Sequence, residues 1–386
     1  MHRLEELIKK LCPNGVEYKK LEKITKSVNI GINPRKFFKL NPDDATGFYV
    51  TVRELNGLNG VIQTEKTDLI NDDAIKTIQA RANIENGDIL FSNTGTVGKM
   101  ALVNYETLNW GVNEGIFVIK PNNEIVNSKY LYYYLDSNLA YADYSKMFTG
   151  STMKHITQKA LLSVSIPVPP LEIQCEIVRI LDAFTSLSLE LSSELKARQK
   201  QYEYYRNTLV NKEKNKSLSE ILKIKNGKDY KALGDGNIPV YGTGGIMTYT
   251  SKFAYDKPSV LIPRKGSLNK LYYVEEPFWN VDTIFYTEIN EEIVIPKYVF
   301  YCLENEHLEE LNTAGGVPSL TQAVLNKVKI YIPGLEEQKE IVGILDKLYY
   351  LVNDISSGLP AEIEKRQKQY EYYRDLLLSF KEVQYE

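Results

Sequence analysis

Two stretches of the chain space their apolar residues alternately by four and three positions, the spacing of one face of a helix that packs on another helix. In the first stretch these residues are Ile173, Ile177, Ile180, Phe184, Leu187 and Leu191, and in the second they are Ile341, Leu345, Leu348, Val352 and Ile355. A helix of about 40 residues is roughly 60 Å long, too long to be buried in one domain. We therefore expect two long helices that pack antiparallel on each other as a coiled-coil rod.

The second of these helices contains two residues that oppose helix formation. Gly358 costs about 1 kcal/mol in a helix interior, and Pro360 lacks a backbone donor and clashes with the preceding turn. Pro360 would suit the first turn of a new helix. The sequence therefore predicts a bend or a break between Ser356 and Ala361.

The stretches that precede the two helices have a different pattern. Short apolar runs read FYVTV, DILFS and GIFVIK before the first helix, and SVLIP, TIFYT and KIYIP before the second. Turn signals rich in glycine and asparagine separate these runs, as expected for strands. An aromatic helical segment, SKYLYYYLDSN, occupies residues 128–138. Strands mixed with short helices predict an α+β fold.

Self-comparison shows that the chain is two copies of one unit. LEIQCEIVRILD (171–182) and LEEQKEIVGILD (335–346) agree at nine of twelve positions, and RQKQYEYYR occurs unchanged at 198–206 and 366–374. Weaker matches join the globular parts: DILFSNTGTVGK with SVLIPRKGSLNK, ITQKALLSV with LTQAVLNKV, and WGVN (110–113) with WNVD (279–282). The strong agreement between the helices indicates that both serve the same role, whereas the weak agreement between the two globular parts indicates that their roles differ.

The repeat predicts four segments related by a pseudo-two-fold axis. Two similar α+β domains span residues 1–168 and 214–333, and the long helices that separate and join them span residues 169–213 and 334–386.

Composition narrows the class of protein only slightly. The net charge of −3 argues mildly against nucleic-acid binding, but the acidity is concentrated in the last 50 or so residues and leaves the globular parts near neutral. No apolar run reaches the length of about 18 residues that a membrane span needs, and the first residues do not form a signal peptide. Three widely spaced cysteines fit a reducing environment, so we expect a cytoplasmic protein.

Known catalytic and metal-binding patterns are missing from the sequence. GTVGK (95–99) resembles the end of a phosphate-binding loop, but Asn93 and Met100 stand where the full motif needs glycine and Ser or Thr. We therefore interpret it as a turn in which the glycines supply positive φ. The three histidines are isolated. We expect no catalytic residue, no metal site and no cofactor in this chain.

Basic and hydroxyl residues in turns are the candidates for contact with DNA, because phosphate contacts need cations and small donors in such places. An ordinary solvated side chain is the alternative for each residue taken singly. The repeat adds weight, since Thr94, Thr96 and Lys99 match Lys265, Ser267 and Lys270. The full set is Arg35, Lys36, Lys39, Arg81, Thr94, Thr96, Lys99, Lys154, Lys228, Lys231, Thr243, Arg264, Lys265, Ser267 and Lys270.

The duplicated helix motifs, GLPAEIEKRQKQYEYYRDLLLSF near the end of the chain and IPVYGTGGI at 238–246 together resemble one family, the specificity subunits of type I restriction-modification systems. The resemblance covers essentially the whole chain, although GLPAEI has no counterpart in the first helix. It implies that each globular part is a target recognition domain for one half of a split, asymmetric site in double-stranded DNA.

The same resemblance implies the partners of the chain. The helices would hold two methyltransferase subunits, which carry S-adenosylmethionine, and restriction subunits would add ATP- and Mg²⁺-dependent cleavage. The partner-binding surface implied by motif match consists of Gln174, Glu176, Arg198, Tyr202, Tyr205, Arg206, Gln338, Glu340, Arg366, Tyr370, Tyr373 and Arg374.

Two other classes of protein stay open at this point. One is a tandem coiled-coil scaffold that binds no nucleic acid, and the other is an enzyme with an unrecognised site. Steep salt dependence and sequence preference in DNA binding would exclude the scaffold. Activity of the chain alone would be required for the enzyme.

Overall fold

The computed structural model describes residues 2–34, 37–105, 109–312, 318–354 and 356–383. The chain divides into two compact units, of which unit 1 contains Met1–Leu189 and Lys365–Glu386, and unit 2 contains Glu190–Glu364. The divisions fall inside the long helices rather than at their ends. Among the described helices, none combines the length and the apolar character that a bilayer span requires.

Unit 1 is built on a four-stranded antiparallel sheet in the order β2-β8-β5-β6. A three-stranded sheet in the order β4-β3-β7 lies alongside, with β3 and β7 parallel, and β1 pairs with β9. The strands are β1 (Tyr18–Lys20), β2 (Thr25–Ile30), β3 (Gly47–Val50), β4 (Leu69–Ile70), β5 (Ile89–Ser92), β6 (Met100–Leu102), β7 (Trp110–Val112), β8 (Ile116–Pro121) and β9 (Ser165–Pro167).

Unit 2 repeats this topology strand for strand. Its sheets have the orders β11-β17-β14-β15 and β13-β12-β16, with β12 and β16 parallel, and β10 pairs with β18. The strands are β10 (Lys216–Ser217), β11 (Leu222–Asn226), β12 (Ile238–Gly242), β13 (Gly245–Thr250), β14 (Ser259–Pro263), β15 (Tyr272–Val274), β16 (Trp279–Asn280), β17 (Ile284–Ile289) and β18 (Lys329–Ile330). The prediction of one α+β fold used twice is confirmed.

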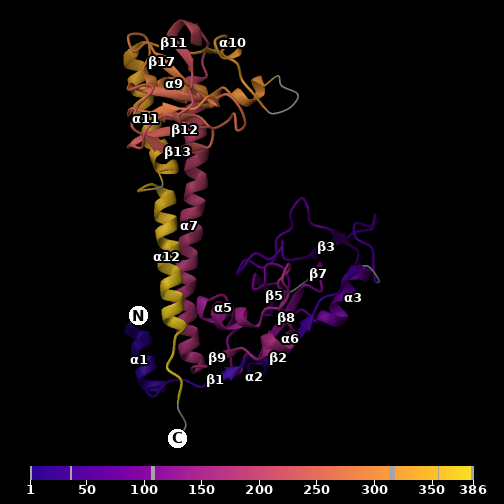
Figure 1. Cartoon of the computed structure of the whole chain (residues 1–386). Helices are drawn as coiled ribbons and strands as arrows, with labels where there is room; N and C mark the ends of the chain where they lie inside the picture. The colour runs from indigo at the N-terminus through magenta and orange to yellow at the C-terminus, as the bar shows by residue number, and fades with distance from the viewer. Residues whose placement is uncertain (1, 35–36, 106–108, 313–317, 355, 384–386) are drawn as a thin grey trace. The chain divides into compact units, whose positions relative to one another are not determined.

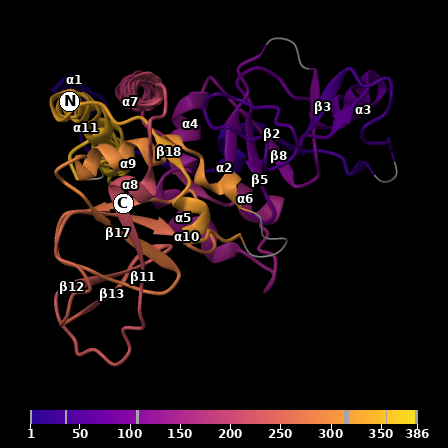
Figure 2. The ribbon, with the colours of Figure 1, turned by 90° about the horizontal axis from the view of Figure 1, so that it is seen from above.

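Short helices complete each unit. One of them, α3 of unit 1, has no counterpart among the described helices of unit 2. In unit 1, α3 packs against β7, and Figure 2 shows it next to β3. A side chain in place of Gly111 in β7 would meet Ile78 of α3 at 2.5 Å, whereas Asn280 occupies the matching position of β16. The short helices are α1 (His2–Leu11), α2 (Leu21–Ile24), α3 (Asp72–Ala82), α4 (Ser128–Leu135), α5 (Asn138–Tyr144), η2 (Ser145–Met147), α6 (Gln158–Leu162), α8 (Leu218–Ile221), α9 (Pro296–Asn305), η3 (Leu308–Leu311) and α10 (Gln322–Leu325).

The central strands are buried on both faces, which explains their continuous apolar runs. In β5, Ile89 and Phe91 join one hydrophobic cluster and Leu90 joins another. In β14, Val260 and Leu261 likewise belong to two different hydrophobic clusters. The first of these faces is covered by the aromatic helix α4 in unit 1 and by α9 in unit 2, and Figure 1 shows α9 between the strands and α11.

The long helices differ in continuity. The first, α7, runs without interruption over Leu171–Val210. The second is divided into α11 (Leu335–Asn353) and α12 (Leu359–Leu378), with Pro360 in the first turn of α12. The predicted break is confirmed, and it begins at Asp354, slightly earlier than expected.

Each unit packs its own parts of the long helices antiparallel. In unit 1, Phe184 of α7 stacks on Tyr373 of α12 with ring centroids 5.6 Å apart. In unit 2, Tyr202 contacts Tyr349, while Lys212 pairs with Glu337 at 2.9 Å. The repeated segment at 198–206 therefore belongs to unit 2, and its copy at 366–374 belongs to unit 1.

Candidate nucleic-acid interface and helix anchors

A hollow of about 990 Å³ in unit 2 brings together three of the residues predicted to contact DNA, Lys228, Lys231 and Thr243. The hollow lies where β11 ends, beside the β12–β13 turn and the turn at 281–283 between β16 and β17. Trp279 fixes the backbone here, because its indole Nε1 donates a hydrogen bond to the carbonyl of Lys228 at 2.9 Å. Both lysine side chains are exposed and free to meet phosphates.

The basic segment at 264–270 is attached to the same turn. The backbone N–H of Arg264 donates to the carbonyl of Thr283 at 2.9 Å, and its guanidinium reaches the carbonyl of Asp282 at 3.5 Å. Lys265, Ser267 and Lys270 are exposed along this segment. Gly266 has a φ of 84°, a conformation that favours glycine.

Unit 1 presents a matching surface around residues 93–99. Asn93 precedes the predicted residues Thr94, Thr96 and Lys99, and its backbone N–H donates to the carbonyl of Gly115 in the β7–β8 turn at 2.8 Å. Lys154 lies against the same segment, because its carbonyl accepts from the N–H of Gly95 at 2.9 Å. Gly95 and Gly98 have φ values of 76° and 92°, so the interpretation of GTVGK as a glycine turn is confirmed.

Arg53 is a cation that the sequence interpretation missed. The ammonium of Lys99 donates to the carbonyls of Val52 at 2.8 Å and Arg53 at 3.2 Å, which places Arg53 beside the segment at 93–99. Its side chain is about half exposed. A single arginine after a strand carries no signal in the sequence, and only the fold brings it to this surface.

The remaining candidates of unit 1 lie elsewhere or are not described. Arg81 stands in the last turn of α3, near the end of β8 that carries Lys120, whereas the segment at 93–99 adjoins the start of β8. Lys39 lines a small hollow with residues of the first turns of α3. We therefore leave Arg81 and Lys39 out of the candidate interface. Arg35 and Lys36 fall outside the described residues.

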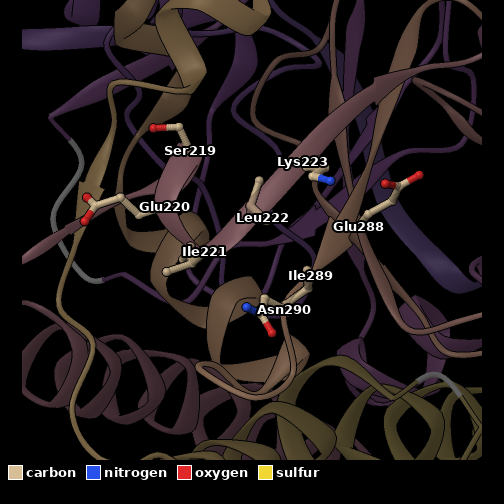
Figure 3. A pocket seen from close by; sticks show the side chains of 8 residues that line it. All are labelled: Ser219, Glu220, Ile221, Leu222, Lys223, Glu288, Ile289 and Asn290. Carbon is tan, nitrogen blue, oxygen red and sulfur yellow. The ribbon is translucent and has the colours of Figure 1, made fainter.

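A second hollow of unit 2 contains none of the predicted DNA-contacting residues. Figure 3 shows it between residues 219–223 and 288–290. The carboxylate of Glu220 accepts from the backbone and the hydroxyl of Ser217, each at 2.7 Å, and Glu288 pairs with Lys225 at 3.5 Å. Since these groups hold local structure, we assign no binding role to this hollow.

Over the described ranges, no group of three or more His, Cys, Asp or Glu side chains is arranged to hold a metal ion. His155 is exposed, and its imidazole contacts the hydroxyl of Thr149 at 2.8 Å.

Gln174 and Gln338 attach the long helices to their own domains. The carbonyl oxygen of Gln174 accepts from the N–H of Asn127 at 2.8 Å, and its amide donates to the carbonyls of Pro169 and Ile125. Gln338 makes the same three contacts with Ile295, Pro333 and Ile293. Both side chains are fully buried, so the expected direct contact with a partner is corrected to an anchoring role.

The tyrosine and arginine of the repeated motif form a second anchor. In unit 2, the guanidinium of Arg206 lies over the ring of Tyr202 at 5.3 Å and pairs with Glu304 of α9 at 3.3 Å. In unit 1, Arg374 lies over Tyr370 at 5.5 Å and pairs with Asp136 at 2.9 Å. Burial is the main cause that raises the pKa of Tyr370 to about 12. Tyr202 and Arg374 are buried, so for these two side chains anchoring within a unit replaces the expected partner contact. Arg206 and Tyr370 are partly exposed, and their contact with a partner stays a prediction.

The other members of the predicted partner surface are more accessible. Tyr205 and Glu340 are exposed, and Tyr373 is half-buried on Phe184. Arg198 and Arg366 each donate to a glutamine three residues further on, Gln201 and Gln369. Glu176 is the exception, because its carboxylate is buried against Arg179 and Arg3, and the hydrogen bond from Arg179 lowers its pKa.

Tyr204 and Tyr372 are exposed aromatic residues at matching positions that the predicted partner set did not include. Their side chains are 66% and 65% exposed, the most open of the tyrosines in the repeated motif. The duplication could have identified them, since a residue kept in both copies but not needed for anchoring serves another purpose.

A family model described as the type I restriction modification DNA specificity domain matches this chain twice, over residues 13–200 and 211–365. A putative type I restriction enzyme specificity subunit of Haemophilus influenzae is 35% identical over 73% of this chain and 81% of its own length. The EcoR124I/EcoR124II specificity subunit of Escherichia coli is 33% identical over 65% of this chain and 70% of its own length.

Solved structures are similar in fold. The S subunit of a type I restriction-modification system from M. genitalium aligns with a TM-score of 0.58 and 18% identity, over 94% of this chain and 96% of the other. A chain solved in work on complex assembly and conformational transition of the type I R-M system aligns with a TM-score of 0.60 and 17% identity, over 95% and 98%. These likenesses support the fold alone.

Proposed function

Because this chain belongs to the type I restriction modification DNA specificity family, we propose that its two units each read one half of a split, asymmetric site in double-stranded DNA. One observation carries the proposal. Both units attach a basic segment to the same turn of the same topology, at 93–99 in unit 1 and at 264–270 in unit 2, but with different side chains. Two domains of the same fold that present different side chains suit the recognition of two different half-sites.

The proposed partners are two methyltransferase subunits, held by the exposed residues of the long helices, and restriction subunits. Tyr204, Tyr205 and Tyr372 supply the large amphipathic surface that protein interfaces favour. In this proposal S-adenosylmethionine belongs to the methyltransferases, and ATP and Mg²⁺ belong to the restriction subunits. This chain contributes recognition and no catalytic group.

The near-neutral charge of the globular parts predicts how much of the DNA affinity comes from this chain and how much from its methyltransferase partners. Few phosphate contacts come from each unit, so the chain alone should bind DNA weakly and the complex with methyltransferase should bind tightly. Tight, sequence-specific binding by the purified chain at physiological salt would contradict this division.

Mapping of methylated adenines in DNA from cells that carry the chain and its methyltransferase tests the function directly. We expect one motif with two specified halves and an unspecified gap. Replacing residues 214–333 by the same region of another family member should change one half of the motif and keep the other. A motif that does not change, or the absence of any motif, would refute the proposed function.

A further inference from the structure

We propose that Asp282 reads a base in unit 2 by accepting a hydrogen bond from the exocyclic amino group of cytosine or adenine in the major groove, and that the matching Asn113 donates to a base in unit 1. The inference rests on the proposed function, because it assigns base-reading residues to the same DNA interface. Neither residue belongs to the basic set expected from the sequence.

The placement of Asp282 is the first part of the evidence. It lies in the turn between β16 and β17 and lines the hollow that also contains Lys228 and Lys231. Its own carbonyl and that of Thr283 hold Arg264, so the basic segment at 264–270 adjoins the same turn. Asp282 therefore lies beside Lys228, Lys231 and Arg264, cations that would contact phosphates.

The second part is that this carboxylate is free. Asp282 is exposed, and among the described residues no side chain or backbone donor pairs with its carboxylate. The other acidic residue of the hollow is different, since the carboxylate of Asp229 accepts from the backbone N–H of Lys231 at 3.0 Å and holds a local turn. An unpaired carboxylate repels phosphate, but it suits the amino group of a base edge.

The third part is the contrast with unit 1. Asn113 occupies the matching turn between β7 and β8, since WGVN aligns with WNVD and both turns follow the strand of the parallel pair. Its side-chain oxygen accepts from the N–H of Gly115 at 2.9 Å, which leaves the amide NH₂ to donate. The N–H of Asn93 and its side-chain amide hold the same turn through Gly115 and Glu114.

The two units thus present opposite chemistry at one position of one scaffold. Unit 2 offers an acceptor, which matches the amino groups of cytosine and adenine. Unit 1 offers a donor, which matches the O6 and N7 acceptors of guanine, the O4 of thymine and the N7 of adenine. This difference suits a protein that must read two unlike half-sites.

The test is a binding selection with the full chain in complex with its methyltransferase, using duplex DNA in which both half-sites are randomised. For Asp282→Asn, we expect the preference for cytosine or adenine at one position of one half-site to fall about tenfold, the loss typical of one base contact. The other half-site should be unchanged. Asn113→Asp should alter one position in that other half-site.

Asp229→Asn is the matched control, because it removes a carboxylate of the same hollow whose oxygen already serves the local turn. It should leave both half-sites unchanged. If Asp282→Asn keeps every base preference and only changes overall affinity, the carboxylate acts as a surface charge and the inference is overturned. Loss of a preference for guanine or thymine would overturn it as well. If the unmodified complex selects no motif, the proposed function itself fails.

Discussion

Arg374 lies in the second copy of the repeated motif, and its guanidinium is almost fully buried in unit 1. It pairs with Asp136 at 2.9 Å and with Asp375 at 3.2 Å, and it covers the ring of Tyr370. Arg374→Ala would remove this buried guanidinium, with its packing on Tyr370 and its hydrogen bonds to Asp136 and Asp375, and we expect unit 1 to lose about 2 kcal/mol of stability. Urea unfolding, with hydrogen exchange followed at α4, measures this loss.

Gln367→Ala is the control for Arg374, because in the described part of the chain this exposed side chain bonds only to Glu371 on the same helix, at 2.7 Å. Its effect should stay within about 0.5 kcal/mol. Equal effects of the two substitutions would show that the pair of Arg374 and Asp136 does not anchor α12. Arg206→Ala should act in the same way on unit 2.

Glu220 gives the stability of unit 2 a specific dependence on pH. Hydrogen bonds from the backbone N–H and the hydroxyl of Ser217, and then from Lys216, lower its pKa from 4.5 to about 2. Because the folded pKa lies below the unfolded one, the carboxylate stabilises the fold above pH 4.5. This contribution is lost as the pH falls from 4.5 towards 2.

Glu220→Gln should therefore lower the free energy of unfolding at pH 7, and the difference from the unmodified protein should shrink steadily below pH 4.5. NMR titration of the carboxyl carbon measures the midpoint directly. Ser217→Ala removes one donor and should move that midpoint up towards 4.5. A midpoint near 4.5 in the unmodified protein would show that the hydrogen bonds from Ser217 do not stabilise the Glu220 carboxylate.

At the scale of elements, Gly343 and Gly358 belong to the same divided helix, but there is room for a side chain at Gly343 and none at Gly358. A Cβ on Gly343 in α11 would meet nothing within 4 Å, and Arg179 stands at the matching position of α7. Gly343→Ala should raise the stability by about 0.5–1 kcal/mol. Thermal unfolding measures the gain.

A Cβ on Gly358 would lie 2.7 Å from the carbonyls of Asp354 and Tyr350, so the break between α11 and α12 depends on glycine. Gly358→Ala should lower the melting temperature, because backbone atoms must shift. A rise for both substitutions would show that the chain prefers one continuous helix to the observed break.

Periodicity and repetition predicted most of these elements but not their pairing. The apolar runs identified β5, β8 and β14, because strands buried on both faces are continuously apolar, and a shorter run, IFY, identified β17. The parallel pair β3–β7 joins Phe48 to Trp110, a contact that only tertiary packing determines. The seam of the helices likewise could not show that residues 366–374 anchor unit 1 through Asp136.

The candidate site was only partly predictable for the same reason. Lys99 and the basic residues at 264–270 were predicted because they lie in turns, and the repeat that aligns the two segments added weight. Arg53 and Asp282 carry no local signal, and they join the site through a turn and a hydrogen bond that bring distant segments together. The buried anchoring roles of Gln174 and Arg374 were also hidden, since partner contact and anchoring within a unit both use conspicuous polar residues.

At the scale of the whole chain, the two units are joined twice, and both links are helical. One division falls between residues 189 and 190 in α7, and the other falls between residues 364 and 365 in α12. If these links set the distance between the two half-sites, both must lengthen together. An insertion into α7 alone would then be opposed by α12.

Four residues added to each link, near Ser192 and near Glu364, extend a helix by about 6 Å and rotate its end by about 40° beyond a full turn. At about 3.4 Å per base pair this is nearly two base pairs, and the apolar seam can absorb the rotation as a stutter. We therefore expect the unspecified gap of the DNA motif to grow by one or two base pairs while the bases in each half stay the same. Adenine-methylation mapping of the double insertion measures the gap, and the single insertion in α7 is its control, expected to lose activity. A double insertion that keeps full methylation at the original gap would show that the helical links do not set the spacing.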